Sequence, residues 1–178
     1  MRLSFSKISF PAAKVLLGWH GALAEHDRGG RAALRRAADP YEAVTEPAAL
    51  RLLRALEAHP EIEIGARDHL SIAAVAALAA RVDEHEGKAS VAVQMAGSRE
   101  GLDRPRVSTA RFRRLLESPS LDDRFSQLAR ITRLLDQRLN LLDLAEALCS
   151  WGPGLRRRWA YDYYAIADQH RSTEESAS

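Results

Sequence analysis

The sequence predicts an all-α fold, a helical bundle of about seven or eight helices. Apolar residues recur at three- and four-residue spacing along almost the whole chain, prolines and capping residues separate these repeats, and no alternating strand pattern of useful length appears. A chain of 178 residues can bury a core of its own. We therefore expect one domain over residues 1–178, subdivided into helical halves 9–86 and 108–171 by a flexible connection, 87–107.

In the first half, prolines and an aspartate delimit the helices. Pro11 and Pro47 suit the first turn of a helix, and Asp27 can cap one. Asp39-Pro40 and His59-Pro60 should each end one. The last helix of this half is rich in alanine, which favours close packing at the middle of the bundle. These signals predict helices from Pro11 to about His26, from Asp27 to Asp39, from Glu46 to His59 and from about Ala66 to Glu84.

In the second half, serine and asparagine supply the caps. Ser120 and Asp123 form a capping box, and Ser108 and Asn140 stand before other apolar repeats. A glycine- and proline-containing turn at 151–154 leads into the last helix. We expect a short helix over 91–96 inside the connection, and further helices from 108 to 116, 120 to 135, 140 to 150 and 154 to about 170.

The basic residues are almost all arginines, and they are clustered. Only Lys7, Lys14 and Lys88 among the 26 basic residues are lysine. Three runs without acids hold many of the arginines, at 28–36, 104–114 and 156–158. A guanidinium can donate two parallel hydrogen bonds to a phosphate, so such clusters can follow a nucleic-acid backbone without reading bases. The formal net charge is only +2. The clustering of the arginines, and not the total charge, therefore indicates a polyanionic partner.

The runs differ in how well they suit that role. In the first, the four arginines fall within an arc of roughly 140° of one helix and so form one surface. In the second, Arg104 and Arg106 lie in a proline-containing loop before Arg111, which suits wrapping a strand. The arginines of 156–158 point in three directions, which favours a structural role. The acid-rich region 57–86 would leave another face for a protein partner.

We expect neither an enzyme nor a cofactor or metal. Asp83 to Glu86 have metal-ligand types, but adjacent residues of a helix point apart, so we interpret them as a solvated helix end. No phosphate-binding glycine loop or nucleophile motif appears. The single Cys149 lies in an apolar run and is interpreted as a core residue of a cytoplasmic protein. No stretch approaches the ~20 apolar residues of a membrane span, so we expect no membrane contact.

Five segments in a specific order resemble one known family. They are DRGGRAALRR (27–36), EPAALRLL (46–53), VSTARFRRLL (107–116), LCSWG (148–152) and WAYDYY (159–164). From Val15 to Tyr164 the chain resembles the CasB family, the small subunits of type I-E CRISPR Cascade surveillance complexes. The resemblance implies a non-catalytic helical protein, with two copies packed head to tail inside the complex.

The resemblance also implies partners and binding residues. The partners would be crRNA, the target and displaced DNA strands, the Cascade backbone and large subunits, and a second copy of the chain. The protein would hold the RNA–DNA R-loop and the displaced strand. Arg35, Arg36, Arg106 and Arg111 match the family's basic surface, and Arg67 falls near a basic position. Together with the two acid-free runs, the predicted nucleic-acid-binding residues are Arg28, Arg31, Arg35, Arg36, Arg67, Arg104, Arg106, Arg111, Arg113 and Arg114.

The abundance of arginine is also compatible with roles that involve no phosphate backbone. A GC-rich genome favours arginine over lysine, and surface arginines often only solvate a helix. A helix-turn-helix regulator would also be helical and basic, but no pair of short helices here is flanked as that motif requires. A helical scaffold protein could use the arginines in salt bridges to other subunits. Binding to single-stranded DNA separates these possibilities.

Overall fold

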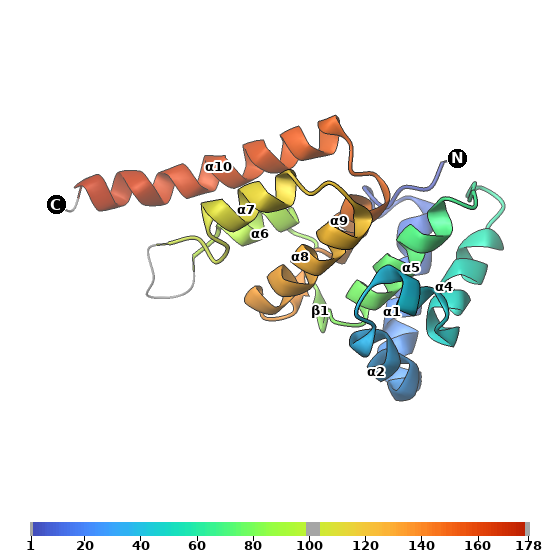
Figure 1. The fold of residues 1–178 in the computed structure, drawn as a ribbon. Coiled ribbons are helices and arrows are strands. Elements are labelled where there is room, and N and C mark those ends of the chain that lie inside the picture. The colour runs from blue at the N-terminus through green and yellow to red at the C-terminus, as the bar shows by residue number, and fades with distance from the viewer. Residues whose placement is uncertain (1, 99–103, 177–178) are drawn as a thin grey trace.

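The computed structural model describes residues 2–98 and 104–176, and these form ten helices and two very short strands (Figure 1). The all-α class is therefore confirmed. Residues 99–103, in the middle of the predicted connection, lie outside the described residues. The elements are α1 Pro11–His26, α2 Arg28–Arg36, α3 Pro40–Val44, α4 Pro47–Glu57, α5 Asp68–Ala79, β1 Glu84–His85, α6 Val91–Ala96, α7 Thr109–Leu116, α8 Leu121–Leu134, β2 Arg138–Leu139, α9 Leu141–Cys149 and α10 Pro153–Ser176.

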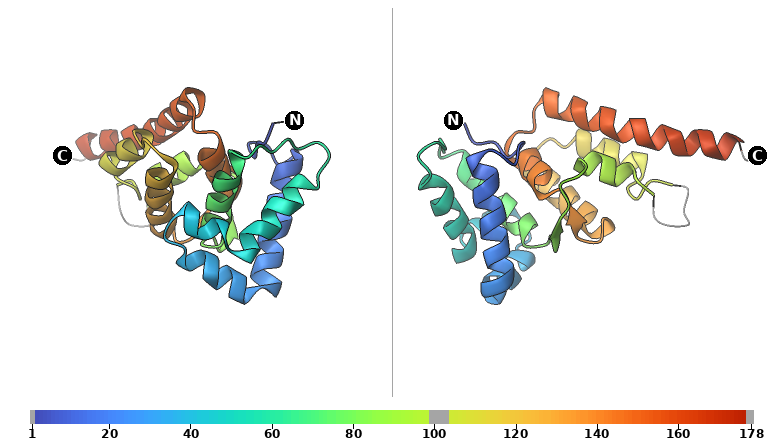
Figure 2. Two further views of the ribbon diagram at one scale, coloured as in Figure 1. Left: turned by 45° about the vertical axis from the view of Figure 1, so that its right-hand side comes forward. Right: turned by 180° about the vertical axis from the view of Figure 1, so that it is seen from behind.

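Helix α5 lies at the centre of the bundle. Every residue from Ile72 to Ala80 is buried. Helices α3 and α4 pack on it from the N-terminal half, and α8 and α9 pack on it from the C-terminal half. Figure 2 shows it enclosed by these neighbours. A helix that is apolar all round belongs in the interior, so the central position predicted from its alanines is confirmed.

The predicted caps and first-turn prolines mostly occur where expected. The Asp27 carboxylate accepts the Gly30 N–H at 2.8 Å, and the Ser120 hydroxyl accepts the Asp123 N–H at 3.1 Å. Asp39-Pro40 behaves differently from the prediction. It does not only follow the end of α2 but also begins the five-residue helix α3, because the Asp39 carboxylate accepts the Glu42 N–H at 2.9 Å.

The end of α5 also differs from the prediction. The helix stops at Ala79, and the following residues turn to pair with the segment after α8. The Asp83 N–H donates to the Gln137 carbonyl at 2.8 Å, and β1 pairs in parallel with β2. The prediction that a helix extends to Asp83–Glu86 is therefore wrong, although the three acidic side chains of this segment are exposed as expected. Side chains of α1 and α2 replace the missing helical bonds, for example His20, whose Nε2 lies 2.9 Å from the Val82 carbonyl oxygen.

Helix α10 covers one edge of the C-terminal half and packs on α6 and α7 (Figure 1). The Tyr163 ring stacks on Phe112 with centroids 3.9 Å apart, and its hydroxyl donates to the Val107 carbonyl at 2.6 Å. Both rings are fully buried. This contact fixes the orientation of α7 and with it the direction of the α7 arginines.

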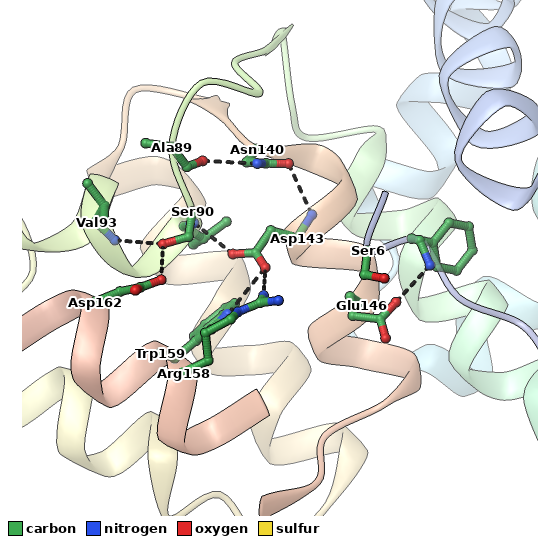
Figure 3. A network of polar contacts seen from close by, with 12 residues as sticks. Ser6, Ala89, Ser90, Val93, Asn140, Asp143, Glu146, Arg158, Trp159 and Asp162 are labelled. Atoms are coloured by element: carbon green, nitrogen blue, oxygen red, sulfur yellow. Dashed lines mark hydrogen bonds and ion pairs between the residues drawn. The ribbon is translucent and has the colours of Figure 1, made fainter. Parts of the chain in front are cut away.

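A buried carboxylate joins three helices of this half (Figure 3). Asp143 of α9 accepts the N–H of Val91 at 2.8 Å and the indole N–H of Trp159 at 3.4 Å, and it pairs with Arg158. Burial raises the pKa of the Asp143 carboxyl, while the Val91 N–H and the Arg158 charge act in the opposite direction. Within the run 156–158, Arg158 thus has the structural role that was expected.

Candidate nucleic-acid interface

A groove of about 400 Å³ lies between α7 and α8, and four arginines line it. Arg111 and Arg114 come from α7, while Arg130 and Arg133 come from α8. All four side chains are exposed. No carboxylate is among the groove's lining residues in the described part of the chain. The groove therefore presents positive charge that no acid at its surface neutralises.

The helical spacing explains how the four arginines meet. On α7, Phe112 and Leu115 are fully buried, which leaves the residues before each of them at the edge of the buried face. On α8, positions 130 and 133 are three apart and so lie on neighbouring turns of one face. Gln127 joins the two helices, because its amide donates to the Arg114 carbonyl at 3.3 Å. Ile131 and Leu134 contribute the apolar part of the lining.

Arg130 and Arg133 were not among the predicted residues, although a signal for them exists. The stretch 124–135 contains three arginines and no acid, like the runs at 28–36 and 104–114. An acid-free stretch on an amphipathic helix indicates a basic face even where the arginines are not adjacent.

Arg106 belongs to the loop before α7, and its side chain contacts the C-terminal end of α8. Its Nη2 donates to the Leu134 carbonyl at 3.1 Å and pairs with Asp136. Asp136 and Gln137 form a left-handed turn with φ values of 55° and 60°. The Gln137 side-chain carbonyl accepts a bond from Arg35 at 3.4 Å. Consecutive residues of one turn thus contact an arginine from each of the two predicted runs.

Two arginines of α2 bind the end of α5. The Nε atoms of Arg31 and Arg35 both donate to the Ala80 carbonyl, at 3.2 and 2.7 Å. Arg31 also donates to the Val82 carbonyl at 3.1 Å. Both guanidiniums pair with the same oxygen of Asp83, at 2.8 and 2.6 Å. These arginines therefore have a structural role at the end of α5, whatever else they bind.

Arg81 makes the converse contact with the end of α2, and it also lies over the Phe125 ring of α8, 5.3 Å from the ring centroid. It donates to the carbonyls of Arg35 and Ala37 at 3.0 and 2.7 Å, at the end of α2. Burial lowers the pKa of Arg81, and the nearby positive charges of Arg133 and Arg35 lower it further. Arg81 therefore stands between the α2 arginines and the groove. We call the resulting surface the arginine strip; it consists of Arg31, Arg35, Arg81, Arg106, Arg111, Arg114, Arg130 and Arg133.

The structure does not bring every predicted residue into the strip. Arg28, Arg36, Arg104 and Arg113 are exposed on the same elements or beside them, and their role stays a prediction. Arg67 precedes α5 at the end opposite Ala80, and the intervening turns span roughly 18 Å of helix. Arg67 is therefore separate from the other predicted arginines.

The described residues contain no group of three or more His, Cys, Asp or Glu side chains that could hold a metal ion. None of the helices described is long and apolar enough to cross a membrane.

Comparison with known proteins identifies a family. Residues 30–164 match the family described as CRISPR-associated protein Cse2. The fold is similar to that of CasB from Thermus thermophilus, with a TM-score of 0.67 and 24% identity over 87% of this chain and 98% of that one. It is also similar to a chain in the crystal structure of E. coli Cascade bound to a PAM-containing dsDNA target, with a TM-score of 0.63 and 20% identity over 88% of this chain and 97% of that one. A search of curated proteins found no match.

Proposed function

This chain belongs to the Cse2 family of CRISPR-associated proteins, and on that premise we propose that it is the non-catalytic small subunit of a type I-E Cascade complex. Its fold is shared with a chain of a DNA-bound Cascade. In such a complex its partners are crRNA, the target and displaced DNA strands, the other Cascade subunits and a second copy of itself. Its role is to hold the R-loop and the displaced strand open in the cytoplasm.

The observation that supports this role is the arginine strip. It joins positive side chains from α2, α7 and α8, the turn after α5 and the loop before α7, which are far apart in sequence. Among the described residues, its ion pairs involve only two carboxylates, Asp83 and Asp136. Like charges gathered in this way repel one another, and a polyanion relieves that repulsion and releases its own counterions.

Such a surface suits a subunit that does not read sequence. Guanidiniums contact phosphates of any sequence, and phosphate contacts fix position without reading bases. In RNA-guided recognition the guide supplies specificity by base pairing, as in Cas9-type effectors. Each phosphate contact to the displaced strand then disfavours its return to the duplex.

Binding of single-stranded DNA by the purified chain tests the assignment. We would measure the fluorescence anisotropy of a labelled oligo(dT) at several salt concentrations, with a variant that replaces all four groove arginines by alanine. About 0.7 counterions are released per phosphate contact on a single strand. Losing four contacts should therefore reduce the slope of log binding constant against log salt concentration by about 2.8 in magnitude. A matched control removes the same charge from exposed positions outside the groove: Lys14, Arg54, Lys88 and Arg157.

The outcomes separate the possible functions. Loss of affinity and of salt slope in the groove variant but not in the control supports the proposal. Equal losses in both would show that net charge, and not the groove, drives binding. A sequence preference would indicate a regulator, and no binding by the unaltered chain would indicate a scaffold. Reconstituting the complex without this chain tests the larger role: DNA opening should weaken while guide RNA binding persists.

A further inference from the structure

Two carboxylates lie directly on the arginine strip, one beside α2 and one at the end of α8. Asp83 lies between Arg31 and Arg35, and one of its oxygens accepts a bond from each. Asp136 pairs with Arg106. Both aspartates are largely in contact with water, with 50% and 61% of their side chains exposed. Each therefore occupies an exposed position where a phosphate oxygen would meet the same guanidiniums.

The arginines are held in place without these carboxylates. Arg31 and Arg35 are anchored by backbone carbonyls through Nε, and Arg106 donates to the Leu134 carbonyl. The backbone beside Asp83 is fixed as well, because the Asp83 N–H donates to the Gln137 carbonyl. Only the aspartate side chain has to rotate for its place to become free. The guanidiniums would then keep their positions and present vacant donors.

From this geometry we propose that Asp83 and Asp136 mark two phosphate positions on the strip, and that nucleic-acid phosphates displace them on binding. The inference rests on the proposed function and specifies two positions on the strip where phosphates of the nucleic-acid strand bind. The carboxylates act as internal competitors. They lower the affinity of the free chain for nucleic acid and keep the arginines paired until a strand is presented.

The exchange is favourable for a physical reason. An exposed guanidinium–carboxylate pair is worth little in water, so breaking it costs little. A phosphate diester can meet a guanidinium with two oxygens, and its binding also releases counterions from the strand. Between Arg31 and Arg35, a single phosphate can take the place of Asp83 and contact both guanidiniums.

Neutral variants of the same shape test this inference in the full-length chain. We would measure oligo(dT) anisotropy for Asp83→Asn, Asp136→Asn and the double variant at about 0.15 M salt, where screening limits long-range effects to about 8 Å. Because the displaced pair is weak, we expect each substitution to raise affinity about two- to fivefold, and the double variant to combine the two gains. The salt dependence should also become steeper.

The controls are Glu61→Gln and the double variant Glu57→Gln/Glu61→Gln, which remove the same charge at the other end of α5. They should leave affinity almost unchanged. If the aspartate variants equal these controls, or bind more weakly, the inference is wrong, even when the groove variant has confirmed DNA binding. If the unaltered chain binds no DNA, the proposed function itself fails. The two positions are tested independently, so a folding defect in one variant leaves the other informative.

Discussion

Replacing Arg81 by methionine should destabilise the fold, although Arg81 belongs to a surface proposed to bind nucleic acid. Its guanidinium donates to the carbonyls of Ala77, Arg35 and Ala37, at 2.9, 3.0 and 2.7 Å. It also lies over the Phe125 ring, 5.3 Å from the centroid. Methionine keeps the aliphatic part of the side chain but removes every donor. The ends of α2 and α5 would then lose the contact that joins them.

The cost follows from these bonds. A hydrogen bond from a charged donor is worth about 1.5–3 kcal/mol. In the variant, water can replace the guanidinium as the donor to a partly exposed carbonyl, which reduces the loss. Removing the Arg81 charge also relieves its repulsion with Arg35 and Arg133, which offsets a further part of the lost stability. We expect the free energy of unfolding to fall by about 2–4 kcal/mol. With a urea m-value of about 2 kcal/mol/M, the midpoint should fall by about 1–2 M.

The matched control is Arg133→Met. Arg133 is exposed and lines the groove, and no hydrogen bond or ion pair of its side chain occurs within the described residues. We expect this variant to keep its stability and to lose part of its DNA affinity, whereas Arg81→Met loses stability. A cost below about 0.5 kcal/mol for Arg81→Met, the range of ordinary surface substitutions, would contradict the structural role of Arg81. Equal destabilisation of both variants would contradict it as well.

Two further predictions concern the C-terminal half. Asp143→Ala leaves the Val91 and Trp159 N–H groups without their acceptor and Arg158 without its ion-pair partner. Urea denaturation should therefore show a free energy of unfolding lower by about 2–4 kcal/mol. A decrease below about 1 kcal/mol would contradict the central role of this carboxylate. Cys149 is partly buried against the core, and this burial raises the pKa of its thiol, so at neutral pH a disulfide reagent should modify it more slowly in the folded chain than after denaturation. Equal rates in the two states would contradict this protection.

Local signals in the sequence predict most of the helices. Asp27, Ser120 and Asn140 cap helices where expected because each side chain bonds an N–H only three residues away. The alanines of α5 predict its burial because small side chains present little polar surface. The same local logic does not reveal α3, since a proline that follows one helix can also begin the next.

The candidate site depends on contacts that no local pattern contains. Arg35 and Arg106 approach one turn because α2 and the segment before α7 both pack beside the end of α8. The turn itself is made of Asp136 and Gln137 in left-handed conformations, and neither is a glycine that would signal it. Likewise, β1 and β2 are two residues long and too short for an alternating pattern. Sequence composition indicates the charge, whereas the tertiary packing decides which arginines share a surface.

The structure also bears on why these residues are arginine and not lysine. A genome bias would favour arginine equally at every basic position. Yet Arg31 and Arg35 each donate from Nε to a backbone carbonyl and from Nη2 to Asp83, and Arg81 bonds carbonyls of two helices at once. A lysine ammonium has no second arm with which to hold two such acceptors in a fixed plane. At these positions the fold requires the several N–H donors of a guanidinium. In the groove, where the described arginines meet no internal acceptor, the same fork remains available to a phosphate.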